Sequence, residues 1–307
     1  MLKKQNGHMY DIIGDIHGQA DMLTNLLKRL GYISRNGVFY HPERKAVFVG
    51  DFINRGPKVR ETINIVRKMT EESYAMTILG NHEINAIYHS VKDENGSSYV
   101  KKPSILDMDS TLRDFKNNQE EWESHIKWMR HLPLFLDLGA IRVVHACWRD
   151  DNIALLRDKL HGGKLKRKFL KKVGKGNSEV ASAFWETIKG IDFKLPKDLL
   201  VYDSSGQAHR SFRSKWWIEM KGLTFAELSY ESRFLLPDYT IPREIIKEVT
   251  PYPVEASPVF FGHYCIRTPN ILSNNLCCLD SCVSRKGRLT AYRWSGEERL
   301  LHENLVT

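Results

Sequence analysis

Cysteine is scarce in this 307-residue chain, which has only five. That odd number does not suggest a set of paired disulfides. Cys277, Cys278 and Cys282 lie close together but lack the CxxC pairs of a zinc ribbon, which excludes that kind of metal site. We therefore expect reduced thiols packed near a core strand.

Long apolar runs are missing as well. The segment from Met1 to Met9 is polar and lacks the apolar run of a signal peptide. No stretch approaches the ~18 uncharged apolar residues that a membrane-spanning helix requires. We expect a cytoplasmic protein without a membrane partner, and the sequence indicates no obligate protein partner.

Internal repeats and long disordered stretches are also lacking. With 42% hydrophobic residues, the chain can bury a substantial core. One large α/β domain with an inserted lid is expected rather than two equal domains. We place the core at residues 1–149 and 256–307 and the basic, aromatic insert at residues 150–255, where the composition changes.

What the chain does have is a set of short segments rich in acidic, imidazole and amide side chains. They are Gly14-Asp15-Ile16-His17-Gly18, Gly50-Asp51 with Asn54-Arg55-Gly56-Pro57, Gly80-Asn81-His82-Glu83, Gly262-His263, and the lone His145. The first three follow short apolar runs, at residues 10–13, 46–49 and 75–79, that are typical of buried strands. Because open α/β sheets carry their active sites at the carboxyl ends of strands, we expect these segments to share one edge.

The residue types of this set predict a site for metal ions. Asp15 and His17 are two residues apart, so on an extended strand end both point to the same side. Asp51 offers two oxygens and can bridge two ions. The remaining candidate ligands are Asn81, His145 and His263.

These mixed nitrogen and oxygen ligands, without thiolate, suit Mn²⁺, Fe, Zn²⁺ or Co²⁺ better than Ca²⁺, and we expect two Mn²⁺ ions. Two ions about 3.5–4 Å apart clamp a phosphoryl oxygen and acidify a bridging water that attacks phosphorus in line. His82 is the expected general acid for the leaving group. Arg55 is expected to place two donors on the phosphate. Glu83 is expected to be an ordinary carboxylate near a helix N-terminus.

These segments resemble the phosphoprotein phosphatase branch of the calcineurin-like metallophosphoesterases, whose blocks read GDxHG, GDxxDRG, GNHE, HA or HG, and GH. Within that branch, the chain is most similar to symmetrical diadenosine tetraphosphate hydrolases. Further similar stretches are Trp128-Met129-Arg130-His131-Leu132-Pro133-Leu134, Leu279-Asp280-Ser281-Cys282 and Leu289-Thr290-Ala291-Tyr292-Arg293-Trp294. The resemblance covers residues 9–147 and 258–295 well and residues 150–255 poorly.

The resemblance implies a fold and a role for each candidate. The fold is a four-layer α/β/β/α sandwich of two mixed sheets. In the implied site, Asp15 and His17 hold the first metal, Asp51 bridges, and the second metal is held by Asn81, His145 and His263. His82 resembles the family's acid, and Arg55 resembles its phosphate-binding arginine.

Two departures from the family pattern are visible. Asn54 stands where the protein phosphatases have an aspartate that pairs with the catalytic histidine, and an amide does not stabilise an imidazolium as a carboxylate does. Similar dinucleotide hydrolases also lack that aspartate, so the departure favours a dinucleotide over a protein substrate. Ser281-Cys282 replaces Thr-Gly, which is expected to alter a turn rather than the chemistry.

The insert contains a basic run with seven Lys or Arg residues and no acidic one, from Lys164 to Lys175. Such runs are most often solvated faces. The alternative is a basic lid in which Lys166, Arg167 and Lys168 bind the distal phosphates of a substrate, steered by the net charge of +9. The aromatic residues of the insert either pack a small core or offer a face on which an adenine stacks.

Together these features predict a dinuclear metallophosphohydrolase that acts on a dinucleoside polyphosphate, with symmetrical cleavage to two nucleoside diphosphates. The alternatives are a serine/threonine protein phosphatase, a broad phosphomonoesterase, or an enzyme acting on capped RNA. A non-catalytic nucleotide or nucleic-acid binding protein is a further alternative, but it has no need of a complete metal set. The fold alone does not choose among these substrates.

Overall fold

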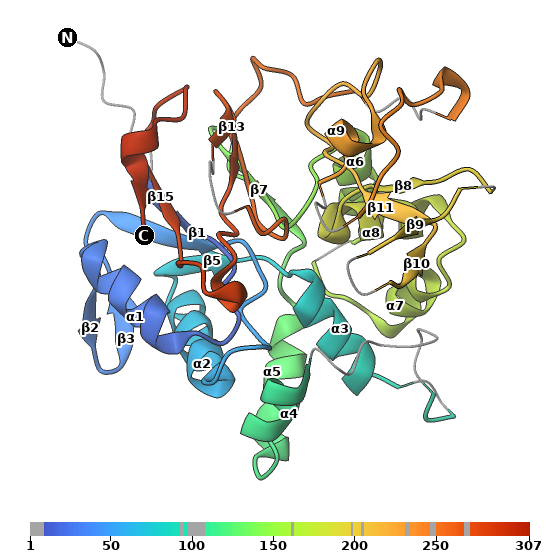
Figure 1. The fold of residues 1–307 in the computed structure, drawn as a ribbon. Helices are drawn as coiled ribbons and strands as arrows, with labels where there is room; N and C mark the ends of the chain where they lie inside the picture. The colour runs from blue at the N-terminus through green and yellow to red at the C-terminus, as the bar shows by residue number, and fades with distance from the viewer. Residues whose placement is uncertain are drawn as a thin grey trace.

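The computed structural model describes residues 9–92, 95–97, 108–160, 163–197, 199–203, 206–230, 234–245, 250–266 and 271–307. At its centre are two five-stranded sheets with helices packed around them (Figure 1). Each sheet contains parallel and antiparallel neighbours. The expected α/β sandwich of two mixed sheets is therefore confirmed.

The first sheet is built around the amino-terminal strands. Its spatial order is β16 (Leu305–Val306), β15 (Ala291–Trp294), β1 (Met9–Ile13), β4 (Arg44–Phe48) and β5 (Ala75–Thr77). Strands β1, β4 and β5 run parallel, and β15 pairs antiparallel with β1. Four of the five β1 residues are buried, as expected for a parallel strand covered on both faces. The strands predicted from the sequence lie within a few residues of these.

The second sheet is built from later parts of the chain. Its order is β13 (Ile271–Ser273), β14 (Leu276–Cys278), β12 (Val259–Phe261), β7 (Arg142–Val144) and β6 (Phe135–Asp137). The three central strands are parallel, and the two edge strands are antiparallel to their neighbours. The carboxyl ends of β7, β12 and β14 consequently point to the same edge.

An apolar layer joins the two sheets face to face. Ile12 and Val49 from the first sheet pack in one cluster with Val143, Phe260 and Leu279 from the second, and all five are fully buried. Burying side chains of this size contributes about 1.5–3 kcal/mol each. This layer fixes the position of one sheet edge relative to the other.

Helices cover the outer face of the first sheet. They are α1 (Ala20–Arg29), α2 (Val59–Glu71), α3 (Asn81–Ser90), α4 (Asp109–Asp114) and α5 (Gln119–Met129). In α1, Leu23, Leu26 and Leu27 are buried at the predicted helical spacing. The sequence also predicts a helix at residues 104–115, of which the first four lie outside the described part. Within the described ranges, every helix is too short or too polar to span a bilayer.

Shorter elements complete the described chain. A hairpin of β2 (Ile33–Arg35) and β3 (Val38–Tyr40) follows α1 and packs against α2. Residues 150–255, named the insert from here on, contain α6 (Asp150–Lys159), α7 (Arg167–Gly174), α8 (Glu179–Lys189), β8 (Asp192–Lys194), β9 (Val201–Tyr202), β10 (Ala208–His209), β11 (Ser211–Arg213), α9 (Phe225–Leu228) and the 3-10 turn η2 (Arg243–Ile245). The last stretch of the chain adds η3 (Val283–Arg285) and η4 (His302–Asn304).

The insert packs against both halves of the sandwich. Leu170 of α7 and Phe184 of α8 belong to the same core as the helices on the first sheet. Trp216 and Phe225 belong to the core on the outer face of the second sheet. Both aromatic rings are buried, so they fill a core rather than offer a free face for a base. Figure 1 shows the later part of the insert in yellow and orange.

The cysteines correct part of the sequence expectation. Cys147, Cys277 and Cys278 are buried reduced thiols, as predicted, but Cys265 and Cys282 form a disulfide across 17 residues. The Asp280 carboxylate accepts the amides of both partners, at 2.7 Å and 2.9 Å, and so draws the two turns together. Cys282 has φ +60°, a conformation open to the glycine of similar hydrolases.

Candidate metal centre

The predicted ligands all follow the carboxyl ends of parallel strands. Asp15 and His17 follow β1, Asp51 follows β4, Asn81 opens α3 beyond β5, His145 follows β7, and His263 follows β12. Because the two sheets pack with these ends together, ligands up to 248 residues apart meet, as when Asp15 Oδ2 accepts the His263 amide at 3.1 Å. The single shared edge expected from the sequence is present.

The backbone at this edge is unusual. His17, Asp51 and His263 have left-handed conformations, with φ of +47°, +49° and +68°. Such conformations cost about 1–3 kcal/mol for residues other than glycine and concentrate at functional sites. Asp51 in turn holds the first ligand segment, since its carbonyl accepts the amides of Ile16 and His17 at 3.1 Å and 2.9 Å.

Glu83 stabilises the strained turn at Asp51, a role that the sequence analysis missed. Its buried carboxylate accepts the amides of Asp51 and Phe52 at 2.8 Å and 3.0 Å, and that of Gly80 at 2.9 Å. Burial, followed by the neighbouring Asp51 charge, raises the pKa of Glu83 to about 7. A carboxylate placed three residues after a turn glycine suggests only a helix cap, because the partners 30 residues away are not visible in the sequence.

Asp51 lies at the junction of the histidines. Its Oδ2 atom is 3.4 Å from His145 Nε2, 3.7 Å from His82 Nε2 and 3.9 Å from His17 Nε2. Two groups of side chains have ligand atoms within 4.8 Å of one another: His17 with Asp51 and His82, and Asp51 with His145 and His263. Asp51 is the member that both groups share.

The histidine rings are oriented by backbone carbonyls. His145 Nδ1 donates to the Val49 carbonyl at 2.8 Å, and His17 Nδ1 donates to the Ile53 carbonyl at 3.3 Å. Each bond leaves Nε2 facing the cluster, which is the usual arrangement of a metal-binding histidine. Asn81 Oδ1 lies 3.2 Å from His145 Nε2 and so belongs to the same cluster.

The residues present fit divalent metal ions. Asp15 Oδ1 and His263 Nε2 are buried, and each lacks a hydrogen-bond partner among the described residues. Buried polar atoms are normally satisfied, so both are in position to hold an ion. Carboxylate, amide and imidazole ligands without thiolate are those preferred by Mn²⁺, Zn²⁺ and Fe.

The charges of the cluster act strongly on one another. Burial lowers the pKa of His145, but the Asp51 and Asp15 carboxylates outweigh it and raise the pKa to about 10. Burial, together with Arg213 and His145, holds the pKa of His263 well below its usual range. Burial and the Asp280 charge raise the pKa of Asp15. The Asp15 carboxyl group and the His145 imidazole therefore favour their protonated forms, and a bound cation would displace these protons.

His82 is held by a short chain of buried hydrogen bonds. Thr111 Oγ1 donates to Asn54 Oδ1 at 2.5 Å, and Asn54 Nδ2 lies 2.8 Å from His82 Nδ1. An amide nitrogen only donates, so His82 Nδ1 accepts and the ring carries its proton on Nε2, the atom that faces Asp51. All three residues are buried. Asn54 thus orients His82 from the position where protein phosphatases have an aspartate.

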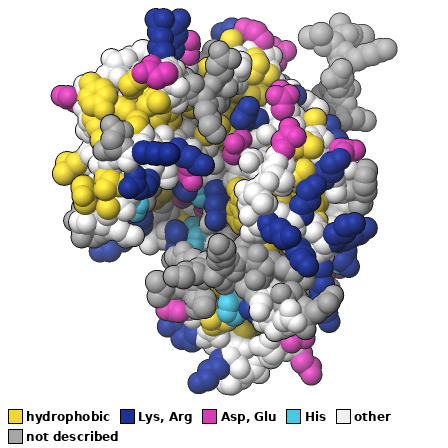
Figure 2. All heavy atoms as spheres, turned by 90° about the vertical axis from the view of Figure 1, so that its right-hand side faces the viewer, with side chains coloured by type: hydrophobic (Ala, Val, Ile, Leu, Met, Phe, Trp, Pro, Cys, Tyr) yellow, Lys and Arg dark blue, Asp and Glu magenta, His cyan; other side chains and the backbone are white. Residues whose placement is uncertain are grey.

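Arg55 lies beside the cluster, and its role as a phosphate-binding residue stays a prediction. One of its terminal nitrogens is 3.3 Å from His17 Nε2 and 3.1 Å from Ser284 Oγ. The residue is exposed, and its backbone is left-handed with φ +65°. Its guanidinium therefore lies at the surface and contacts the candidate ligand His17 from there. Viewed from the insert side, the molecule is hollowed, with histidine (cyan) and Lys or Arg (dark blue) side chains in the hollow (Figure 2).

The three residues expected to form a lid lie in the insert. Lys166, Arg167 and Lys168 are exposed at the start of α7. This helix packs against α3 through a bond from Tyr88 Oη to the Leu170 carbonyl. Tyr88 is seven residues along α3 from Asn81, a distance of about 10 Å at 1.5 Å per residue. A role of these three side chains at the substrate therefore stays a prediction.

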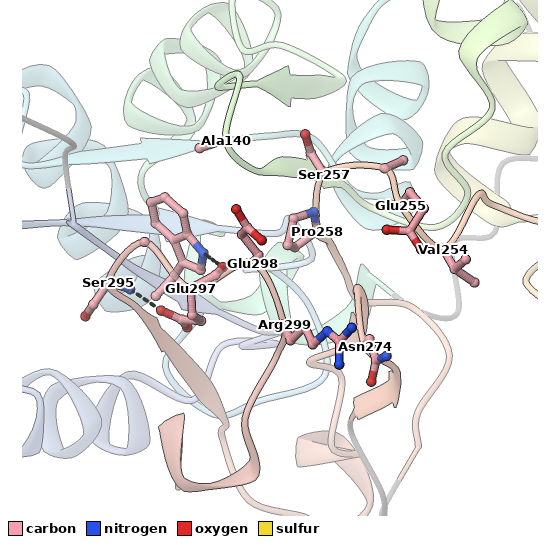
Figure 3. Close-up of a pocket in the computed structure, with 13 residues that line it drawn as sticks. Ala140, Val254, Glu255, Ser257, Pro258, Asn274, Ser295, Glu297, Glu298 and Arg299 are labelled. Atoms are coloured by element: carbon pink, nitrogen blue, oxygen red, sulfur yellow. Dashed lines mark hydrogen bonds between the residues drawn. The ribbon is translucent and has the colours of Figure 1, made fainter. Parts of the chain in front are cut away.

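A large surface cavity of about 950 Å³ lies away from the ligands (Figure 3). It is lined by residues that precede β7, β12 and β14, including Ala140, Pro258 and Asn274. The ligands follow these strands, so the cavity belongs to the opposite edge of the sheets. Glu297, one of its acidic residues, is engaged by Tyr292, Asn304 and the Ser295 amide.

Comparison with known families and curated proteins agrees with this geometry. A model of the family described as calcineurin-like phosphoesterase matches residues 10–217. Bis(5'-nucleosyl)-tetraphosphatase PrpE of Bacillus subtilis, designated asymmetrical, is 35% identical over 148 residues, 47% of this chain and 59% of the relative. The protein of the same name from Oceanobacillus iheyensis is 34% identical over 142 residues, 44% of this chain and 54% of the relative. The matches thus span little more than half the length of these relatives.

A solved structure shares the fold over most of the chain. The cold-active protein-tyrosine phosphatase of a psychrophilic Shewanella aligns with a TM-score of 0.55, covering 96% of this chain and 80% of that one. The sequences are 16% identical, so this likeness concerns the fold alone.

Proposed function

This chain belongs to the calcineurin-like phosphoesterase family and is a metal-dependent phosphoesterase, and from that premise we propose that its substrate is a dinucleoside polyphosphate. The substrate class is supported by the names of the similar tetraphosphatases. The observation that carries the catalytic assignment is the position of Asp51, which two groups of candidate ligands share. The chain is expected to use two ions, with Mn²⁺ the proposed metal.

In the proposed site, Asp15 and His17 would hold one ion, Asn81, His145 and His263 would hold the other, and Asp51 would be shared by both. Bound divalent ions supply a Lewis acid for a phosphoryl oxygen and lower the pKa of a water at phosphorus. Arg55 is exposed at the rim and can place a guanidinium on a phosphate that enters from solvent. His82 directs its Nε2 proton toward Asp51, where it can donate to the leaving-group oxygen of a bound substrate.

The position of cleavage is open to direct measurement. The sequence resemblance favours symmetrical cleavage, whereas the two tetraphosphatases reported above are designated asymmetrical. Water attack on diadenosine tetraphosphate yields two ADP in the first case and ATP with AMP in the second. Both outcomes are compatible with the same metal cluster, because the difference lies in which phosphorus is placed beside it.

The test is a panel of substrates given to Mn²⁺-loaded protein: diadenosine tetraphosphate, a phosphopeptide, a capped RNA and an aryl phosphate. The expected result is the highest kcat/KM for the dinucleotide, with products identified by chromatography. Faster turnover of the phosphopeptide would replace the proposal with a protein phosphatase. Reconstitution with Zn²⁺, Co²⁺ or Fe²⁺ in parallel tests the choice of metal.

A further inference from the structure

Helix α8 of the insert ends beside the metal cluster. The Thr187 carbonyl accepts the amides of Ala146 and Cys147, the two residues that follow the candidate ligand His145, at 3.1 Å and 3.3 Å. One half-turn earlier, the Trp185 ring stacks on Tyr88 of α3, with ring centroids 5.9 Å apart. Helix α8 therefore contacts α3 through this ring pair and brings its carboxyl end to the residues that follow His145.

Lys189, the last residue of α8, lies two residues beyond Thr187. Its ammonium is 4.4 Å from the centre of the Trp185 ring, four residues back along the same face. Its neighbour Gly190 packs against Tyr264, which follows the candidate ligand His263, so the end of α8 lies against the residues that follow both His145 and His263. The side chain is half-buried, and among the described residues it has neither an ion pair nor a hydrogen bond to a carboxylate.

The charges that act on Lys189 are those of the cluster and its surroundings. Burial lowers the pKa of Lys189, the Arg213 charge lowers it further, and Asp192 and Asp51 partly compensate. Arg213 is the strand partner of Asp192 and also lowers the pKa of His263. Gly190, which follows Lys189, leaves the space that the Tyr264 ring occupies next to His263. The lysine thus shares one electrostatic environment with Asp51.

We propose that Lys189 binds the phosphate group next to the one that is hydrolysed, forming a second anion subsite on the insert side of the cluster. This rests on the proposed function, because only a substrate with linked phosphates has a second phosphate to offer. A half-buried ammonium without a carboxylate partner gains a charge-assisted bond when a phosphate oxygen arrives. Trp185 holds the ammonium in place through its ring face.

The first experiment compares Lys189→Met with a control, Lys171→Met, which removes an exposed lysine of α7. In Mn²⁺-loaded protein at low ionic strength, Lys189→Met is expected to raise KM for diadenosine tetraphosphate about tenfold, the effect of one bond to a charged group. KM for para-nitrophenyl phosphate should change far less. Lys171→Met should match the parent with both substrates, and Lys189→Arg should recover part of the lost affinity.

The second experiment does not depend on the natural substrate. Imidodiphosphate has two linked phosphates and resists hydrolysis, so its dissociation constant is measured beside that of inorganic phosphate. Lys189→Met should weaken imidodiphosphate several-fold more than phosphate, and this result supports the subsite even if the parent does not hydrolyse dinucleotides.

Three outcomes would overturn the subsite. Equal weakening of both anions, or a fall in melting temperature with both affinities kept, assigns Lys189 to the stability of the α8 end. No change in either ligand's affinity shows that no phosphate reaches the ammonium.

Discussion

The ligand edge and the insert differ in how tightly their side chains are held. At the ligand edge, Asp51 and His82 are buried and bonded through residues from separate elements. In the insert, Lys166 and Lys168 project from the outer face of α7 into solvent. Parallel strands must bring their carboxyl ends together, whereas a charged surface helix satisfies its pattern in many orientations. The difference teaches that chemistry at strand ends is more predictable than binding by surface charge.

The largest expected effect comes from replacing Asp51, which both groups of candidate ligands share. Asp51→Asn should lower metal content, and kcat should fall by about 10³-fold, since several kcal/mol of charge stabilisation are lost at about 1.4 kcal/mol per tenfold. Metal content is measured by elemental analysis and turnover by product release. Asp158→Asn, at an exposed position of α6, is the control and should keep both. If the Asp51→Asn protein kept two ions and full turnover, Asp51 would not be the bridging ligand.

The second effect tests whether His82 acts on the leaving group. His82→Ala should keep its metal and lose about 10²–10⁴-fold in kcat with an alkyl phosphate, as expected when a general acid is removed. An activated aryl phosphate should lose less, because its leaving group needs little protonation. Equal losses with the two substrates would exclude a role at the leaving group and leave His82 as a structural contact of Asp51.

A third prediction concerns protons displaced by metal. The Asp51 and Asp15 charges outweigh burial and raise the pKa of His145 to about 10, so the metal-free protein carries a proton there at pH 7. Metal binding needs the neutral ring, so affinity should rise with pH up to about 10, roughly tenfold per pH unit for each proton released. Calorimetric titrations in buffers with different ionisation enthalpies count the protons. Binding without proton release would mean that His145 is neutral or not a ligand.

The fourth prediction tests the hydrogen bond from Thr111 to Asn54, which orients His82 at the ligand edge. Thr111→Val keeps the shape but removes the donor to Asn54 Oδ1, so the amide is free to turn away from His82. We expect about fivefold to tenfold lower kcat with poor leaving groups, the value of one neutral hydrogen bond, with KM kept. Thr111→Ser restores the hydroxyl and should restore the rate. A Thr111→Ser variant as slow as Thr111→Val would point to packing instead.

The two regions also show what the sequence can and cannot predict. Asp15, Asp51 and Asn81 were located because a short apolar run before each marks a strand, and strand ends meet by geometry. The left-handed backbone at Asp51 and the bonds from Glu83 were not foreseen, since no local pattern reports a partner 30 residues away. For the same reason Thr111, 57 residues from Asn54, was missed.

Long-range pairing explains the remaining differences as well. Cys265 and Cys282 are joined because Asp280 gathers both turns, and their spacing of 17 residues carries no mark of it. Lys189 has an ordinary sequence context at the end of a helix, and only the packing of α8 on α3 shows where it lies. The basic run of α7 attracted the prediction instead because charge density is visible in the sequence and orientation is not.

The smallest expected effect tests that run directly. Lys166, Arg167 and Lys168 are exposed at the start of a helix that contacts α3 about 10 Å along its axis from Asn81, so we expect them to act on a substrate through solvent-screened charge. Replacing all three with alanine should raise KM for diadenosine tetraphosphate about twofold to fivefold in dilute buffer, within the range of exposed charge pairs. The effect should vanish near 0.15 M ionic strength, where the screening length is about 8 Å. Because Lys189 is half-buried, its contribution should persist at that salt concentration, so the two sets separate in one salt titration. A triple variant that exceeds Lys189→Met at high salt would place the lid on α7 after all, and one that matches the parent at low salt would leave the run as a solvated face.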